Sequence, residues 1–276
     1  LKQFQYLSQS KKTRFFEGGL RFNNKNIKRP MFSIITVVFN GEKYLRKTIE
    51  SVKKQGFKDY EYIVIDGGST DSSLKIIKEY KNDIDYWVSE KDNGIYDAFN
   101  KGMKLAKGEF IGIINSDDIY KPNALKTISK YINANPKIDF IFGSVKKHWG
   151  ILHGYRPHKI RYSWGFYTSH STGFFLKRKA AEKVGKYDLR YKYHADYDYL
   201  YRLIVKKKLL GMATKKNEVV GIFRRGGFSS TIKFKELFKE EIKIRYNNGQ
   251  NIFLILIIIV YRGFKHLNKF FKWKIP

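Results

Sequence analysis

Residues 110–118 read Phe-Ile-Gly-Ile-Ile-Asn-Ser-Asp-Asp, a short apolar run that ends in two carboxylates. Residues 34–39 (Ile-Ile-Thr-Val-Val-Phe) and 62–65 (Tyr-Ile-Val-Ile) are two more short apolar runs. Such runs are typical of strands that are buried on both faces, as the strands of parallel sheets are. We therefore expect three central strands in these segments, and they decide the fold class.

Apolar residues at helical spacing separate these runs. They are Leu45, Ile49 and Val52, then Leu74, Ile77 and Tyr80, and then Phe99, Met103 and Ala106. Gly108 is expected to end the third helix, and Pro122 to open a fourth at its first turn. Further strands are expected at 86–89 and 139–142. This alternation predicts an α/β fold with a mostly parallel, Rossmann-like sheet, helices on both faces, and ligands beyond the carboxyl ends of the strands.

Beyond residue 143 the pattern is less regular. Residues 144–170 hold four His and two Trp without a clean period, and we expect a long, functional loop region there. Strands are expected at 173–177 and 219–223, and helices at 179–184 and 196–206.

The charge of the chain is strongly unbalanced. Its 276 residues include 55 Lys and Arg but 25 Asp and Glu, a formal net charge of +30. Such a field favours anionic partners, namely nucleic acid, anionic lipid or phosphorylated substrates, although a Lys-rich composition that is merely solvated gives the same total. Cysteine is absent, which excludes disulfides and thiolate metal sites and fits a reducing compartment. Residues 1–30 are basic and lack the apolar run of a secretory signal.

The C-terminal segment has its own pattern. Its apolar run at 252–260 is too short to span a bilayer, since about 20 residues are needed. Apolar residues then recur at helical spacing among basic ones, at Val260, Phe264, Leu267 and Phe271. We expect residues 231–276 to form a basic amphipathic tail on the inner face of an anionic membrane, so that the protein is cytoplasmic and peripherally associated. The alternative is a terminal helix packed on the domain.

Carboxylates follow consecutive strands at the points where these strands end. They are Asp66, Asp97, Asp117 and Asp118. Because the carboxyl ends of parallel strands lie side by side, these side chains are expected to converge on one cleft. An anionic nucleotide diphosphate can enter such a cleft if Mg²⁺ or Mn²⁺ bridges phosphate and carboxylate oxygens. A single Asp in a loop is more often a helix cap, but clusters at successive strand ends indicate a functional site.

Four motifs in this order give the chain a family resemblance. They read Thr-Val-Val-Phe-Asn at 36–40, Ile-Asp-Gly-Gly-Ser-Thr-Asp at 65–71, Glu-Lys-Asp-Asn-Gly-Ile-Tyr-Asp-Ala-Phe-Asn-Lys-Gly at 90–102 and Asn-Ser-Asp-Asp at 115–118. Together they resemble family-2 glycosyltransferases of the GT-A fold, in register over residues 33–142 and more weakly to about 230. The resemblance implies an inverting transfer of a sugar from a nucleotide donor, expected to be a UDP-sugar, with Mn²⁺ or Mg²⁺ as cofactor.

The resemblance also implies a division of the chain. Residues 31–230 would form the GT-A catalytic domain, with a nucleotide-sugar-binding half at 31–142 and an acceptor-binding half at 143–230. Residues 1–30 would be a basic N-terminal extension. The expected acceptor is a hydroxyl of a glycan or lipid-linked molecule in the synthesis of surface polysaccharide or lipooligosaccharide. The lipid link is inferred from the basic tail alone.

The resemblance assigns roles to single residues. Thr36 and Asp66 would contact the base and ribose of the donor. The other residues expected to line the nucleotide pocket are Asn40, Asn93, Asp97 and Lys101. At the Asp-x-Asp-type motif Ser116 replaces the first carboxylate, which leaves Asp118 as the expected metal ligand and Asp117 facing the ribose or donor sugar.

Residues 193–200 (Tyr-His-Ala-Asp-Tyr-Asp-Tyr-Leu) resemble the segment that supplies the catalytic base in this family. Inverting transfer needs a carboxylate that takes the proton from the acceptor hydroxyl while that oxygen attacks the anomeric carbon. Asp196 and Asp198 point in different directions on a helix, so only one of them can be the base. Asp196 is preferred because it precedes the helix proper, although it could instead cap the helix.

Two further residues match weaker parts of the resemblance. His170, before Ser-Thr-Gly-Phe-Phe at 171–175, is expected at the diphosphate or the acceptor, unless it is structural. Arg224 opens a segment, 224–229, that resembles the loop closing over the donor in relatives, where cations neutralise the leaving diphosphate. The alternative for this segment is a basic surface loop.

Two other classes of function stay open at this point. Ser116 suggests a nucleotide-sugar-binding domain without activity. The charge of +30 and the 20 Tyr suggest a nucleic-acid-binding protein, but no binding motif is present and the aromatic residues lie mostly within apolar runs, so no nucleic-acid partner is expected. A Rossmann dehydrogenase is disfavoured because no Gly-x-Gly-x-x-Gly follows the first strand.

Overall fold

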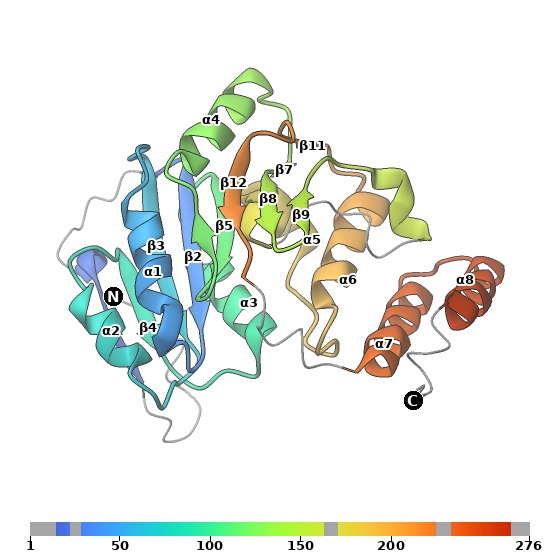
Figure 1. The fold of residues 1–276 in the computed structure, drawn as a ribbon, viewed down its shortest axis with the longest axis horizontal. Coiled ribbons are helices and arrows are strands. Elements are labelled where there is room, and N and C mark those ends of the chain that lie inside the picture. Colours follow the sequence, from blue (N-terminus) through green and yellow to red (C-terminus); the bar gives the residue numbers. More distant parts are fainter. Residues whose placement is uncertain (1–14, 23–28, 163–170, 225–232, 266–276) are drawn as a thin grey trace.

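The computed structural model describes residues 15–22, 29–162, 171–224 and 233–265. One large sheet runs through the centre of the molecule (Figure 1). In order across the sheet its strands are β1 (Phe16–Gly18), β4 (Tyr86–Ser89), β3 (Tyr60–Asp66), β2 (Phe32–Val38), β5 (Phe110–Asn115), β10 (Phe174–Lys177), β7 (Phe140–Phe142) and β11 (Gly211–Ala213). The strands β4, β3, β2 and β5 run parallel, as the apolar runs predicted, whereas β1 and β10 are antiparallel to their neighbours.

The three central strands are buried along nearly their whole length. All seven residues of β2 are buried, as are six of the seven in β3 and five of the six in β5. Continuous apolar sequence suits them because helices cover both faces of the sheet and neither face meets water. β2 spans Phe32–Val38, close to the run predicted at 34–39.

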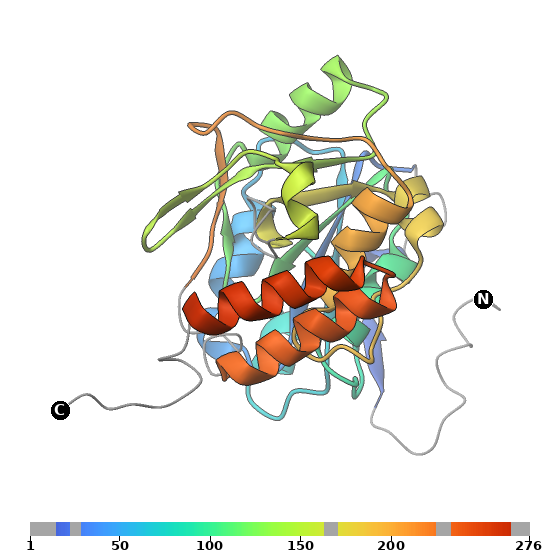
Figure 2. The ribbon, with the colours of Figure 1, turned by 90° about the vertical axis from the view of Figure 1, so that its right-hand side faces the viewer.

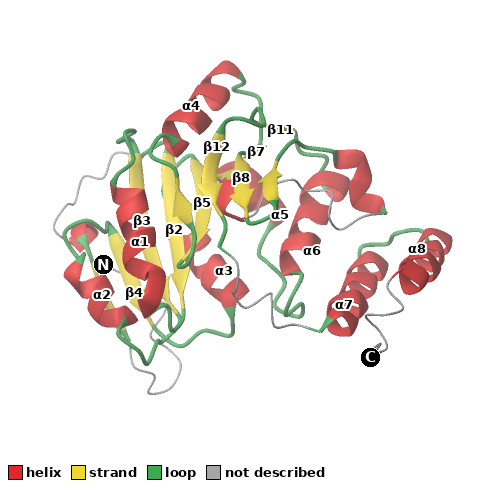
Figure 3. Cartoon of the chain, in the orientation of Figure 1, coloured by secondary structure: helices red, strands yellow, loops and turns green. Residues whose placement is uncertain are grey.

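Helices pack on both faces of this sheet (Figure 3). One face is covered by α1 (Glu42–Lys53), α2 (Ser73–Glu79) and α4 (Ala124–Ala134), and the other by α3 (Ile95–Leu105), α5 (Arg178–Val184) and α6 (Ala195–Tyr201). The predicted apolar stripe of α1 is fully buried. α4 begins at Ala124, so Pro122 precedes the helix instead of lying in its first turn. A π-helix at Arg202–Lys206 continues α6 and completes the helical segment expected there.

A smaller sheet lies beside the large one. Its strands, in order, are β6 (Ile119–Tyr120), β12 (Val219–Ile222), β8 (Ser144–Lys147) and β9 (Gly150–Leu152). The β8–β9 hairpin falls in the region expected to be a loop. Strands of three and four residues are too short to show an alternating pattern, so the sequence did not reveal them. A 3-10 helix follows at Pro157–Arg161.

Part of the predicted N-terminal extension belongs to the large sheet. β1 pairs with β4, and just after β1 the guanidinium of Arg21 forms a 2.5 Å ion pair with Glu61 on β3. Both side chains of this pair are buried. Their separation of 40 residues along the chain explains why a local pattern did not reveal the contact.

The C-terminal segment forms two helices, α7 (Phe234–Asn247) and α8 (Ile252–Lys265), which lie side by side (Figure 2). α7 packs on α6, and α8 packs on α7. The buried carboxylate of Glu241 pairs with Arg245 on α7 at 2.7 Å and with Arg262 on α8. In the described part of the chain no helix is long and apolar enough to cross a membrane. Over its described part the predicted tail is therefore packed on the domain, while one face of α8 stays exposed.

Candidate active site

The loops that follow β2 and β3 are tied to each other. The backbone amide of Asn40 donates a hydrogen bond to the Ser69 hydroxyl at 2.8 Å, and the amide of Thr70 donates one to the Asn40 side-chain oxygen at 2.9 Å. Asn40 has a φ of 50°, a left-handed conformation that Asn adopts more readily than most residues. These bonds fix both loops at the carboxyl edge of the sheet, where the sequence predicted the donor.

Asp66 ends β3 at this edge and is fully buried. Its carboxylate accepts hydrogen bonds from the hydroxyls of Ser69 at 2.5 Å and Ser89 at 2.6 Å, and from the Ser69 amide. Ser89 is the last residue of β4. The Asp66 carboxylate therefore holds the ends of two neighbouring strands together and shapes the loop beside them.

Thr36 does not lie at this edge. Its side chain is fully buried within β2, and its hydroxyl shares a hydrogen bond of 2.9 Å with the hydroxyl of Tyr62. A nucleotide could reach it only if the core opened. The motif match put Thr36 near the donor by its place in the sequence, whereas successive side chains of a strand point to opposite faces. We therefore remove Thr36 from the candidate site.

The third motif brings its predicted residues together at the start of α3. The amide of Asn93 donates a hydrogen bond to Asp97 Oδ2 at 3.0 Å, and Lys101 Nζ lies 2.9 Å from Glu90 Oε1 and 3.8 Å from Asp97 Oδ2. Asn93 is exposed, and Asp97 and Lys101 are half-buried. The amide of Glu90 donates to the Asp66 carbonyl at 3.0 Å, so this polar group lies next to the Asp66 loop.

Asp118 has a structural environment. It is fully buried, and both of its carboxylate oxygens accept hydrogen bonds from the protein, Oδ2 from the Thr172 hydroxyl at 2.5 Å and Oδ1 from the Arg224 amide at 3.1 Å. It thereby joins the loop after β5 to the 3-10 turn at Ser171–Gly173 and to the end of β12. The sequence predicted Asp118 as the direct metal ligand. This stays a prediction; in the structure each Asp118 oxygen accepts a hydrogen bond from one of these buried donors.

Asn115 and Asp117 carry oxygen atoms of the kind that a hard cation binds. Asp117 is half-buried and lines a cleft. The side-chain oxygen of Asn115 is buried, and it accepts no hydrogen bond from any described residue. Carboxylate and amide oxygens are both ligands of Mg²⁺ and Mn²⁺, which complete their coordination with water and substrate phosphates. Among the described residues no cluster of three or more His, Cys, Asp or Glu could hold a metal, so an ion here would depend on substrate oxygens.

The two candidate bases differ in their surroundings. Asp198 is buried, its Oδ2 pairs with Arg202 at 2.9 Å, and its Oδ1 accepts a hydrogen bond from the Asn248 side chain at 2.8 Å. Asn248 follows α7, so Asp198 ties α6 to that helix. Both oxygens of Asp198 are thus occupied, which indicates a structural role.

Asp196 is half-buried at the start of α6. Its Oδ1 accepts hydrogen bonds from the Tyr197 amide at 2.9 Å and from the Tyr96 hydroxyl at 3.2 Å. In the described part of the chain no hydrogen-bond donor meets its Oδ2. Asp196 therefore has one oxygen fixed by the protein and one with which it could take a proton.

The loop before α6 is held by a carboxylate from α7. Glu240 accepts hydrogen bonds from three consecutive backbone amides, those of Lys192 at 2.5 Å, Tyr193 at 2.8 Å and His194 at 2.7 Å. This contact fixes the turn that presents Asp196. No local sequence pattern predicted this contact, because Glu240 lies 46 to 48 residues further along the chain in the segment assigned to the tail.

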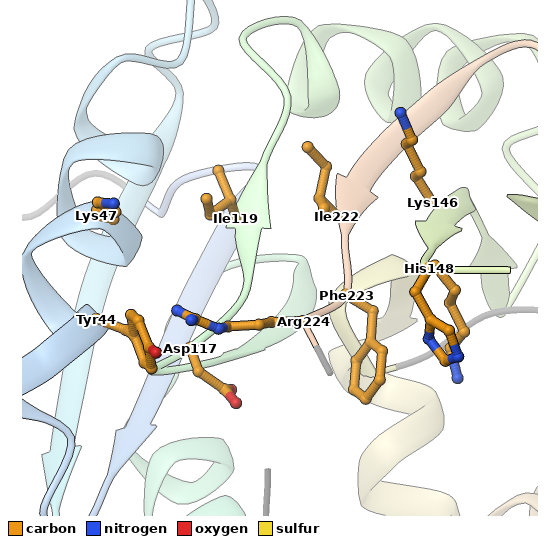
Figure 4. A pocket seen from close by; sticks show the side chains of 10 residues that line it. Tyr44, Lys47, Asp117, Ile119, Lys146, His148, Ile222, Phe223 and Arg224 are labelled. Atoms are coloured by element: carbon orange, nitrogen blue, oxygen red, sulfur yellow. The ribbon is translucent and has the colours of Figure 1, made fainter. Parts of the chain in front are cut away.

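A cleft of about 460 Å³ opens beside Asp117 (Figure 4). It is lined by residues of α1, of β6 and the loop before it, and of the ends of β8 and β12, namely Tyr44, Lys47, Asp117, Ile119, Lys146, Lys147, His148, Ile222, Phe223 and Arg224. The predicted donor-binding residue Arg224 extends toward α1, where its guanidinium lies over the ring of Tyr44. His170 and residues 225–229 of the predicted loop lie outside the described residues.

Comparison with known proteins gives consistent results. The sequence model of a family described as Glycosyl transferase family 2 matches residues 33–197. A curated relative, a PGL/p-HBAD biosynthesis glycosyltransferase from Mycobacterium bovis (strain BCG / Pasteur 1173P2), is 27% identical over 243 residues, which cover 83% of this chain and 90% of the relative.

Two solved structures show the same fold. S. aureus TarS 1–349 in complex with UDP-GlcNAc has a TM-score of 0.61 at 19% identity, covering 88% of this chain and 73% of that one. The chain spans 39% of a longer TarS structure. The mannosyltransferase PcManGT from Pyrobaculum calidifontis, in complex with GDP-Man and Mn²⁺, has a TM-score of 0.62 at 16% identity, covering 97% of this chain and 76% of that one. The fold is thus the GT-A fold that the motifs predicted.

Proposed function

The chain belongs to glycosyl transferase family 2, and from this premise we propose that it transfers a sugar, with inversion, from a UDP-sugar to a hydroxyl of a glycan or lipid-linked acceptor. One observation carries the proposal. The hydroxyl of Tyr96, in the motif at 90–102, donates a hydrogen bond to Asp196, the predicted base. This bond joins the predicted nucleotide-sugar-binding half to the predicted acceptor-binding half.

We place the nucleoside at the edge formed by the loops after β2, β3 and β4. The polar side chains available there are those of Asn40, Asn93, Asp97 and Lys101, with Asp66 buried behind them. Hydrogen bonds within the protein hold these loops, so the site is formed in advance of binding. UDP is the proposed nucleotide because the similar TarS structure holds UDP-GlcNAc.

We assign the role of base to Asp196. As the acceptor oxygen attacks the anomeric carbon, Asp196 Oδ2 takes its proton, the new glycosidic bond forms, and the bond from that carbon to the diphosphate oxygen breaks. The Tyr96 hydroxyl and the Tyr197 amide hold Oδ1 and orient the carboxylate for this transfer. Asp198 takes no part, since Arg202 and Asn248 occupy its oxygens.

Asn115 and Asp117 would hold Mn²⁺ or Mg²⁺ together with oxygens of the donor diphosphate. A bound divalent cation neutralises negative charge on the leaving diphosphate. The buried, unbonded oxygen of Asn115 supports this assignment, as does the Mn²⁺ in the similar mannosyltransferase structure.

We further propose that the exposed face of α8 lies on an anionic membrane. Seven large apolar side chains of α8 are 49% to 73% exposed, Ile252, Phe253, Leu256, Ile257, Val260, Tyr261 and Phe264. Their spacing puts them on one side of the helix, while Ile255 and Ile258 are buried. An apolar helix face on a chain of charge +30 suits the interface of an anionic bilayer and supports a lipid-linked acceptor.

The enzymatic proposal is tested by incubating the full chain with a panel of nucleotide sugars and measuring nucleoside diphosphate release with and without Mn²⁺. We expect release from a UDP-sugar that needs the metal and that falls at least 100-fold in Asp196→Asn, with UDP affinity unchanged. A rate of nucleoside diphosphate release that depends neither on Mn²⁺ nor on Asp196 contradicts the assigned roles.

The membrane proposal is tested by flotation with vesicles that contain anionic lipid. The double variant Ile257→Glu/Phe264→Glu should lose flotation, because it puts two charges on the exposed apolar face without touching the core. Leu210→Glu is the matched control, since Leu210 is also 54% exposed but lies outside α8. Equal flotation of the double variant and the wild type removes the membrane proposal.

A further inference from the structure

The cleft beside Asp117 is basic. Of its ten lining residues four are cations, Lys47, Lys146, Lys147 and Arg224, and one is an acid, Asp117. These cations come from α1, from the end of β8 and from the end of β12, which the fold brings around one hollow (Figure 4). A concave surface with such an excess of one charge concentrates multiply charged ions of the opposite sign.

The cations of the cleft differ from other cations of this protein. Elsewhere lysines pair with carboxylates, as Lys53 does with Asp83 at 2.9 Å and Lys177 with Glu109 at 3.6 Å. None of the four cleft cations forms an ion pair with a described residue. Four cations beside a single lining carboxylate repel one another, and an anion bound between them reduces that repulsion.

The inner part of the cleft is suited to a strong interaction with an anion. Lys147 is half-buried, and its ammonium lies 4.3 Å from the centre of the Phe223 ring. Burial lowers the pKa of this ammonium, against the opposing effect of Asp118. Ile119 and Ile222 add apolar surface beside it. Reduced contact with water strengthens the attraction between a lysine and a bound anion.

The position of the cleft separates it from the proposed nucleoside site. α1, on one wall of the cleft, packs on one face of the sheet, while α3 and α6, which carry Asp97 and Asp196, pack on the other. Asp66 ends β3, which is separated from β5 by β2. A ligand in the cleft therefore approaches Asp117 from the side away from the nucleoside.

Resting on the function proposed above, we propose that this cleft binds a phosphate ester carried by the acceptor, so that the acceptor is an anion. Four cations carry more positive charge than is needed to bind a ligand whose only anionic group is one carboxylate. A phosphate group offers more charge and more acceptor oxygens, and Lys and Arg are the side chains that bind it. Lys147 would bind the phosphate, and the acceptor would extend from there past Asp117 toward the reacting carbon.

Binding of sn-glycerol 3-phosphate to the full chain, saturated with UDP and Mg²⁺, tests this proposal by calorimetry. The wild type should bind the probe saturably and should not bind glycerol. The variant Lys147→Gln should bind it at least tenfold more weakly, while its affinity for UDP stays within twofold. Lys130→Gln is the control, because it removes the same charge from an exposed lysine outside the cleft.

Three results would overturn the proposal. The first is equal affinity of the wild type and the Lys147→Gln variant for the probe. The second is an equal loss in the control, which would assign the effect to overall charge. The third is a matching loss of UDP affinity in the cleft variant, which would assign the cleft to the donor diphosphate. Failure of the proposed function itself is seen separately, as absence of metal-dependent UDP release by the wild type.

Discussion

The hydroxyl of Tyr96 lies 3.2 Å from Oδ1 of Asp196, and it joins two residues that are 100 positions apart in the chain. The same hydroxyl lies 2.8 Å from the backbone carbonyl of Tyr193, so its single proton is shared between two acceptors. The Tyr96 ring stacks on Tyr187, which in turn stacks on Tyr199 of α6. The position of the proposed base is therefore set by a helix of the donor-binding half.

Replacing each candidate base separates their roles. Asp196→Asn should lower kcat at least 100-fold with little change in the unfolding temperature, because a half-buried carboxylate that transfers a proton is lost. Asp198→Asn should instead lower the free energy of unfolding by about 1–3 kcal/mol, because it disrupts the bonds to Arg202 and Asn248. Rates of UDP release and thermal unfolding of both variants check this. A folded, inactive Asp198→Asn beside an active Asp196→Asn would reverse the assignment.

The hydroxyl of Tyr96 can be removed without its ring. Tyr96→Phe should lower kcat by about tenfold, the effect of losing one hydrogen bond to a charged group, and should leave UDP affinity unchanged. Steady-state kinetics with calorimetry of UDP binding measure both quantities. A fall in UDP affinity that accounts for the whole loss of activity would place Tyr96 in the donor pocket instead.

Glu240 should act on catalysis through the loop before α6. Gln keeps one acceptor oxygen but turns an NH₂ group toward backbone amides, so Glu240→Gln loses at least one of the three hydrogen bonds. We expect a several-fold lower kcat, an unchanged KM for the donor and a lower unfolding temperature. Glu236→Gln, on the exposed side of the same helix, is the control and should match the wild type in all three.

The two carboxylates after β5 should respond differently to substitution. Asp117→Asn should remove most of the increase in UDP affinity that Mn²⁺ gives, because an amide binds a divalent cation less strongly than a carboxylate, while the fold is unaffected. Asp118→Asn should chiefly lower stability, because it disturbs the buried bonds to Thr172 and Arg224. Calorimetry of UDP binding with and without Mn²⁺, beside thermal unfolding, distinguishes the two. A metal effect lost in Asp118→Asn alone would confirm Asp118, and not Asp117, as the metal ligand.

The carboxyl of Asp92 gives a pH dependence of stability. Burial raises its pKa, with Asp97 and Asp66 adding to the shift and Lys101 opposing it. The folded protein thus binds this proton more tightly than the unfolded chain does, and stability falls as pH rises from the unfolded pKa through the raised folded pKa.

We therefore expect Asp92→Asn to unfold at a higher temperature than the wild type at neutral pH, and this difference to shrink as pH falls through the raised folded pKa toward about 4. Asn keeps an oxygen to accept the bond from the Gly94 amide, which is 2.9 Å long. Circular dichroism melts across this pH range measure the difference. A difference in unfolding temperature that does not change with pH would exclude titration of Asp92 as the source of that difference.

The core of the fold could be predicted because its signals are local. The runs at 34–39, 62–65 and 110–114 form the parallel strands β2, β3 and β5. The side chains of a continuous apolar run are shielded from water only where both faces of the sheet are covered. The β8–β9 hairpin and β1 were not predicted. These strands are short, and β1 is held in place by a partner far away in sequence.

The sequence by itself determined the family, the parallel core and the edge at which the candidate carboxylates gather, because hydrophobic period, turn residues and motif order are properties of neighbouring residues. The tertiary structure alone decided how deeply each carboxylate is buried and which donors surround it. It buried Asp118 and Asp198 among donors from Thr172, Arg224, Arg202 and Asn248, and it left Asp117 and Asp196 half-buried. A carboxylate's role depends on the burial and hydrogen bonds around it, and distant parts of the chain supply these.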